Sequence, residues 1–377
     1  MGFDRMAAVS PPAGASSPAG GLSGGGRTMV DVVQHASEWP FLGSPSADGA
    51  LGTLGCYDVR RVLGRGAFGV VFEALDTATG HAVAIKVPVP GTGDAPAARR
   101  SFLHEAEMLT DLAHENVVRL IGAGDDPVPF LVMKRIGGTT LGEVIRHNGP
   151  LEPAVVVAIG RQLAAALAAV HARGIVHRDI KPANIVIGTG SGPRVTLIDF
   201  GLAIVQEDAW RMPEGSLRGT PLYMAPEQVA GKTADYPADL FSLGAVLYHM
   251  LTGSPPFDAA TESGVITRIT WEAPRPLREV ASAAPERLVA VITRLLAKSP
   301  AARFRSAAEV NAALGAATEA PFPVPRGMSS LDFRIRGGEP GGRATASFVA
   351  GGRASPHTTA HESVSDAPST MTVVAVS

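Results

Sequence analysis

Apolar and polar residues alternate in short runs between about residue 57 and residue 133. The runs YDVRRVLG, GVVFEAL, HAVAIKV and VPFLVM have the period of two that is typical of β-strands. The stretch RRSFLHEAEMLTDLAH between them instead predicts a helix with one buried stripe, made of Phe102, Ala106, Leu109 and Leu112. This part of the chain is therefore expected to be a small sheet-rich lobe with one helix.

After Gly137 the pattern becomes mostly helical. EPAVVVAIGRQLAAALAAVHARG has Pro153 in its first turn and Gly174 at its end, and it is apolar almost all round. It should therefore lie deep in a helical lobe. PERLVAVITRLLAKS and SAAEVNAALGA predict two further helices, and Ser306 and Glu309 have the spacing of a capping box at the start of the second.

The two ends of the chain differ in composition from the part between them. Residues 1–54 are rich in Gly, Pro, Ser and Ala, and residues 318–377 are rich in Ser, Thr and Gly. Such segments bury too little apolar surface to offset the entropy cost of ordering, so both are predicted to be disordered tails. The globular region is expected to span residues 55–317.

Composition excludes several classes of function. The chain has 377 residues, 45% of them apolar, and a formal net charge of −2, which gives no basic field for nucleic acid. Cys56 is the only cysteine, so no disulfide can form within the chain and a reducing, cytoplasmic location is expected. No run of about 18 apolar residues is present, so we expect no membrane insertion.

A glycine-rich segment and a lysine predict a phosphate-binding end. Gly64, Gly66 and Gly69 in GRGAFGVV follow one strand run and lead into another. A dinucleotide fold would need a helix after the glycines, so a two-stranded flap over a ligand is favoured. Lys86 in VAIK could reach phosphates under that flap, and Glu105 on the following helix is the expected counter-charge.

The segment HRDIKPANIVI brings together an acid, an ammonium and an amide. Asp179 can accept the proton of an attacking hydroxyl, and Lys181 can neutralise a transferring phosphate. Asn184, together with Asp199 at the end of VTLIDFG, supplies the hard oxygen ligands that Mg²⁺ prefers. These residues predict phosphoryl transfer at a metal site.

These motifs occur in the order found in protein kinases, namely GxGxxGxV, VAIK, HRDIKPAN, DFG and APE. The chain resembles a eukaryotic-like (Hanks-type) serine/threonine protein kinase of the bacterial branch, over about residues 57–317. The resemblance implies an α+β, bilobal protein-kinase fold. Its N-lobe, residues 55–136, would be a small antiparallel sheet with one key helix, and its C-lobe, residues 137–317, would be larger and mostly helical.

The resemblance implies a role for each matching residue. Lys86, paired with Glu105, would hold the α- and β-phosphates, Asn184 and Asp199 would bind Mg²⁺ (with Mn²⁺ as the alternative), and Asp179 would be the catalytic base assisted by Lys181. ATP would lie against Leu63, Gly64, Arg65, Gly66, Ala67, Phe68, Gly69, Val71, Ala84, Leu131, Met133, Lys134 and Ile136. Leu109, Leu120, His177 and Phe200 would stack into a regulatory spine, so His177 would pack rather than titrate.

Other matching residues concern substrate class and control. Lys181 and the segment GTPLYMAPE are typical of enzymes that phosphorylate serine and threonine of proteins, with autophosphorylation expected. Arg178 marks kinases that are controlled by a phosphorylated loop, for which Ser216 is the candidate site, whereas Thr220 would bridge Asp179 and Lys181. Glu227 is expected to pair with Arg303, and Asp239 is expected to bond the backbone of the catalytic loop.

The sequence departs from the family pattern at the hinge. Many relatives have Glu and an aromatic residue after the gatekeeper, whereas this chain has Lys134 and Arg135. The Lys134 carbonyl and the Ile136 amide could still bind adenine. A kinase-like scaffold remains the alternative function, although its usual losses, of the lysine, the HRD acid or the DFG acid, are absent. Nothing in the sequence identifies the physiological substrate, the activating signal or the oligomeric state.

Overall fold

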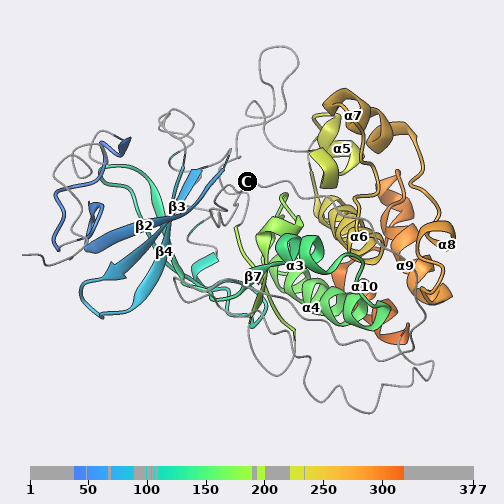
Figure 1. The fold of residues 1–377 in the computed structure, drawn as a ribbon, viewed down its shortest axis with the longest axis horizontal. Coiled ribbons are helices and arrows are strands. Elements are labelled where there is room, and N and C mark those ends of the chain that lie inside the picture. The colour runs from blue at the N-terminus through green and yellow to red at the C-terminus, as the bar shows by residue number, and fades with distance from the viewer. Residues whose placement is uncertain are drawn as a thin grey trace, which may run out of the picture. The chain divides into compact units, whose positions relative to one another are not determined.

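A computed structural model describes residues 38–47, 49–66, 69–88, 99, 103, 106, 109–188, 193–199, 221–232 and 234–317. Within these ranges the N-terminal half forms a six-stranded antiparallel sheet in the order β1-β2-β3-β4-β6-β5 (Figure 1). Its strands are β1 (Gly52–Leu54), β2 (Tyr57–Gly66), β3 (Gly69–Asp76), β4 (Ala82–Pro88), β5 (Leu120–Gly124) and β6 (Phe130–Lys134).

The four strand runs that alternation predicts correspond to β2, β3, β4 and β6. Residues 99, 103, 106, 109 and 110 are helical, and Ala106, Leu109 and Leu112 are buried as the predicted stripe requires. Phe102 lies outside the described ranges. Alternation is clearest in β3, where buried and partly buried residues alternate, whereas the first four residues of β6 are all buried.

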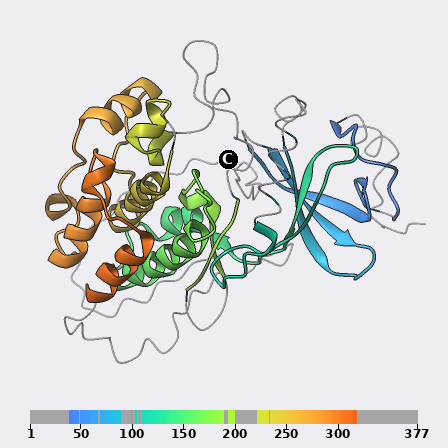
Figure 2. The same ribbon diagram turned by 180° about the vertical axis from the view of Figure 1, so that it is seen from behind.

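The second lobe is mostly helical. A small sheet, β7 (Thr139–Thr140), β8 (Ile185–Gly188) and β9 (Arg194–Leu197), lies among its helices. The helices gather into one bundle that is seen from both sides (Figures 1 and 2). They are α3 (Leu141–Asn148), α4 (Pro153–His171), α5 (Pro226–Val229), α6 (Tyr236–Thr252), α7 (Glu262–Trp271), α8 (Leu277–Val280), α9 (Glu286–Leu295) and α10 (Ala307–Ala316).

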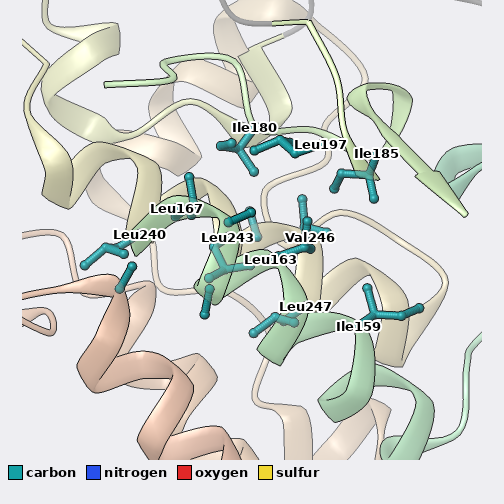
Figure 3. Close-up of a cluster of buried hydrophobic side chains, with 14 of the residues drawn as sticks. Ile159, Leu163, Leu167, Ile180, Ile185, Leu197, Leu240, Leu243, Val246 and Leu247 are labelled. Atoms are coloured by element: carbon teal, nitrogen blue, oxygen red, sulfur yellow. The ribbon is translucent and has the colours of Figure 1, made fainter. Parts of the chain in front are cut away.

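The core of this lobe lies between α4 and α6. Side chains from both helices meet Ile180, Ile185 and Leu197 from the loop and strands beside them (Figure 3). By length and composition α4 is the one helix in the described ranges that could cross a membrane, with a mean hydropathy of 1.8. Half of that window is buried, and α4 contacts α6, α10 and β9, so it is the central helix that its sequence predicts.

The helix ends follow the sequence signals in part. Pro153 is the first residue of α4, and α6 ends before Gly253, which has a left-handed φ of 75°. At the start of α10 the Ser306 side chain accepts the Glu309 backbone N–H, as predicted. The reciprocal bond of the capping box is different, because the Glu309 carboxylate accepts from Arg305 N at 3.1 Å.

Candidate active site

The catalytic loop brings together the acid, the ammonium and the amide that the sequence singles out. Lys181 Nζ lies 3.0 Å from Asp179 Oδ2. The 3₁₀ turn Pro182–Asn184 returns the chain so that Asn184 Nδ2 donates to Asp179 Oδ2 at 2.8 Å and to the Asp179 carbonyl at 2.9 Å. The Asp179 carboxylate is therefore held in place by a cation and an amide.

Asn184 presents an unused oxygen. Its side chain is fully buried, and Oδ1 has no hydrogen-bond partner among the residues that the structure describes. A buried carbonyl oxygen without a partner in the protein is costly, so Oδ1 fits the role of a ligand to a cation. The Ile198 amide donates to the Asn184 carbonyl at 2.9 Å, so Asp199 follows at the adjacent position.

Asn184 and Asp199 fit a divalent cation. An amide oxygen and a carboxylate are hard oxygen ligands. No cluster of three or more His, Cys, Asp or Glu side chains that could hold a metal occurs in the described part of the chain. A cation held by these two residues would therefore need phosphate oxygens and waters to complete its coordination, as a metal that binds with its nucleotide does.

Lys86 is buried in the middle of β4 and forms an ion pair with Asp199. Their side chains are 5% and 9% exposed, so each supplies the counter-charge that a buried ion needs. The sequence predicts both residues at the site but gives Lys86 a different partner, Glu105. Glu105 lies outside the described ranges, and the described partner of Lys86 is Asp199.

The glycine-rich segment forms the β2–β3 hairpin, with Gly66 opposite Gly69. A strand, not a helix, follows the glycines, so the order of strand, glycines and strand is as predicted. Gly69 has a φ of 156°, and a Cβ there would lie 2.3 Å from the Val87 carbonyl oxygen, so no other residue fits. Leu63, Gly64 and Arg65 lie on β2; Ala67 and Phe68, predicted to touch ATP, fall outside the described residues.

The strand register places the remaining nucleotide residues. Val71 pairs with Lys86, which pairs with Leu131, and Ala84 pairs with Met133 in the neighbouring row. β6 ends at Lys134, whose amide donates to the Arg119 carbonyl at 2.9 Å, and Ile136 follows half-buried. A cavity behind Met133 has Lys86 and Asp199 in its wall; its apolar lining consists of Leu109, Val118, Leu120, Leu131 and Met133.

Asp239 anchors the catalytic loop from α6. It is 1% exposed and accepts the backbone amides of His177 and Arg178, each at 2.8 Å, as predicted. It also contacts His171 Nε2 at 2.8 Å. Arg178 and Asp199 both have a left-handed φ, of 65° and 59°, a strained conformation that surrounding contacts must maintain.

His177 packs rather than titrates. It is completely buried, and burial lowers its pKa, so the neutral ring is favoured. Leu109 and Leu120, predicted to stack with it, are also buried. Phe200, the fourth predicted member of that stack, is not among the residues the structure describes.

The APE segment is tied to the rest of the lobe. Arg303 forms a bidentate pair with Glu227 at 2.6 and 2.9 Å, as predicted. Gln228, which sequence reasoning missed, accepts from the Ala225 amide and donates to the Arg178 carbonyl, each at 3.0 Å. Its position directly after the APE motif is the one feature of the sequence that could have pointed to this role. Ser216 and Thr220, the regulatory candidates, lie outside the described ranges.

A family model described as the protein kinase domain matches residues 57–313. The chain belongs to the protein kinase family. Its first lobe and second lobe are the two lobes of that fold, and the resemblance to bacterial Hanks-type kinases is confirmed by its relatives.

Similar proteins include kinases of Mycobacterium and Corynebacterium species. The chain is 38% identical over 259 residues to serine/threonine-protein kinase PknD of Mycobacterium tuberculosis, covering 68% of this chain and 39% of PknD. It is 37% identical over 265 residues to PknE of the same species, covering 70% and 46%. The probable kinase PknB of Corynebacterium glutamicum is 36% identical over 270 residues, covering 69% and 42%. The chain thus spans less than half the length of these curated relatives.

Solved structures agree with this assignment. The kinase domain of Mycobacterium tuberculosis PknI superposes with a TM-score of 0.57 at 29% identity, covering 72% of this chain and 99% of that one. A Rad53 structure in complex with AMP-PNP has a TM-score of 0.57 at 28% identity, covering 68% and 64%. The second of these similar proteins holds an ATP analogue.

Proposed function

We propose that this chain is an ATP-dependent protein kinase that transfers phosphate to serine and threonine of proteins, itself included. The observation that carries the proposal is the convergence of Asp179, Lys181 and Asn184 in one loop beside the Lys86–Asp199 pair. Lys86, Asp179 and Asp199, which a kinase-like scaffold usually lacks in part, are all present. The relatives named above are serine/threonine kinases.

The residues divide the work of phosphoryl transfer between them. Asp179, held by Asn184 and Lys181, is oriented to accept the proton of the attacking hydroxyl. Lys181 also offers its charge to the transferring phosphate, and Lys86 holds the α- and β-phosphates once the nucleotide displaces its contact with Asp199.

We propose Mg²⁺ as the metal, with Mn²⁺ as the alternative, held by Asn184 Oδ1 and the Asp199 carboxylate. When bound, the cation would neutralise charge that develops on the phosphates. Asn184 is prepared for this role, since its Nδ2 is engaged by Asp179 and Oδ1 is left to face a ligand.

Ser216 is the proposed site of activating autophosphorylation.

The test is phosphate transfer to a generic basic protein, followed by phosphoamino-acid analysis. The parent chain should produce phosphoserine and phosphothreonine. Asp179→Asn should lose about 10²- to 10⁴-fold of the rate, which is the contribution expected of a general base. Asp125→Asn, a change at an exposed acid, is the matched control. Phosphotyrosine as the main product, or equal rates for the two variants, would contradict the proposal.

A further inference from the structure

Glu73 lies on the same face of the sheet as Lys86. The register aligns Arg61 with Glu73, Glu73 with Ala84, and Ala84 with Met133 in one row across four strands. Residues directly opposite each other in a sheet share a face, as do residues two apart on one strand, so Lys86 shares the face of Ala84. A carboxylate therefore stands in the row that carries the predicted adenine contacts.

Two arginines neutralise this carboxylate. Glu73 Oε2 lies 2.6 Å from Arg61 Nη2 on β2 and 3.2 Å from Arg135 Nε in the hinge segment after β6. The Glu73 side chain is only 18% exposed, whereas those of Arg61 and Arg135 are 58% and 39% exposed. One partly buried carboxylate thus joins β2, β3 and the hinge in a three-charge network.

The network joins the two segments that are predicted to lie on either side of the nucleotide base. β2 and β3 form the hairpin that is predicted to cover the ligand, and Ile136, one residue after Arg135, is expected to bind adenine through its amide. A contact that holds the hairpin and the hinge together before the ligand arrives reduces the ordering that binding would otherwise require. Arg135 stands where the family pattern described above predicts an aromatic residue, and its charge is what allows this contact.

We propose that Glu73 is a positioning residue that ties the glycine-rich hairpin to the hinge through Arg61 and Arg135 and thereby strengthens ATP binding. The inference rests on the proposed kinase function. Glu73 itself touches no reacting atom. Because both arginine partners are largely exposed, unlike a fully buried cation, the pairs contribute little to folding, and removal of Glu73 should change nucleotide affinity more than stability.

The test is a double-mutant cycle with Glu73→Gln and Arg135→Gln. Each single variant should raise KM for ATP about two- to fivefold and leave kcat within twofold, since a contact made equally in ground and transition states affects KM alone. The double variant should raise KM for ATP no further than Glu73→Gln alone, because both changes break the same contact. Arg135→Lys should keep most of the parent affinity.

Ionic strength separates this role from a merely structural one. The difference in KM for ATP between the parent and Glu73→Gln should shrink at about 0.5 M salt, because exposed charges are then screened. Glu286→Gln, which breaks the exposed pair with Arg278, is the matched control and should leave KM unchanged. Parent-like KM in both single variants, or effects that add in the double variant, would overturn the inference.

Failure of the inference is distinguishable from failure of the proposed function. ATP affinity is measured directly by calorimetry alongside the kinetics. A parent that transfers phosphate while its variants bind ATP equally well would refute only the role of Glu73. A parent that binds no ATP would refute both.

Discussion

Arg303 is the most fully satisfied buried charge in the described part of the chain, and its loss should be costly. Its guanidinium donates all five of its N–H groups: Nε to the Ala297 carbonyl, Nη1 to Glu227 and the Pro237 carbonyl, and Nη2 to Glu227 and the Lys298 carbonyl. The perturbation is Glu227→Ala, which removes the only carboxylate among these acceptors and leaves the cation without its counter-charge.

The magnitude follows from burial. The Arg303 side chain is 0% exposed and that of Glu227 is 12% exposed. Removing one partner of a buried pair costs about 3–5 kcal/mol, and the partial exposure of Glu227 favours the lower end. Since a domain is stable by about 5–15 kcal/mol in total, Glu227→Ala should fold but with much of its margin gone.

The assay is urea unfolding followed by circular dichroism, with kinase activity measured on the same samples. Glu227→Ala should lower the free energy of unfolding by about 3 kcal/mol and reduce activity with it. Replacing both partners, as Glu227→Leu with Arg303→Met, should recover part of the stability because no charge is then stranded.

The control is Glu286→Ala, whose pair with Arg278 is about 70% exposed on both sides and should cost less than about 1 kcal/mol. If Glu227→Ala lowers the free energy of unfolding no more than this control, burial of Arg303 does not make the pair stabilising.

Three further predictions concern the metal, pH and the flap. Asn184→Ala should raise the Mg²⁺ concentration for half-maximal activity about tenfold or more; a Mg²⁺ titration that matches the parent would speak against Asn184 as a ligand. Burial lowers the pKa of His249, whose Nδ1 lies 2.7 Å from the Tyr223 hydroxyl. Its contribution to stability is therefore complete above the unfolded pKa of about 6.5 and lost as pH falls toward the folded value. In His249→Gln the free energy of unfolding, measured with urea, should fall less between about pH 7 and pH 5 than it does in the parent. An equal fall in both proteins would count against this role of His249. Gly69→Ala should weaken ATP binding, measured by calorimetry, because its Cβ would displace the Val87 carbonyl; parent-like affinity would show that the flap tolerates a side chain there.

Much of the fold could be predicted from the sequence because its signals are local. Alternation predicts β2, β3, β4 and β6, and the position of the glycines between two strands predicts the hairpin. The acid, lysine and amide of the catalytic loop converge as expected, because a 3₁₀ turn that begins at Pro182 brings Asn184 back toward Asp179. The Arg303–Glu227 pair could be predicted because the family motif supplies both residues, and the structure confirms it.

What could not be predicted depends on contacts between distant segments. The pairing of Lys86 with Asp199 joins residues 113 positions apart, and no local pattern specifies it. The pairing of Arg61 with Glu73 lies between two irregularities in the β2–β3 register, and each irregularity shifts the pairs beyond it. Gln228 shows no periodicity or charge, yet it links the APE segment to the catalytic loop.

We propose that Asp179 enables this chain to transfer phosphate. The most direct measurement is the intact mass of the purified chain after incubation with ATP and Mg²⁺, beside Asp179→Asn treated in the same way. The parent should gain mass in steps of one phosphate, and the variant should gain none. A parent whose mass is unchanged and that leaves a basic acceptor protein unmodified, while still binding ATP, would contradict this proposal and favour a kinase-like scaffold.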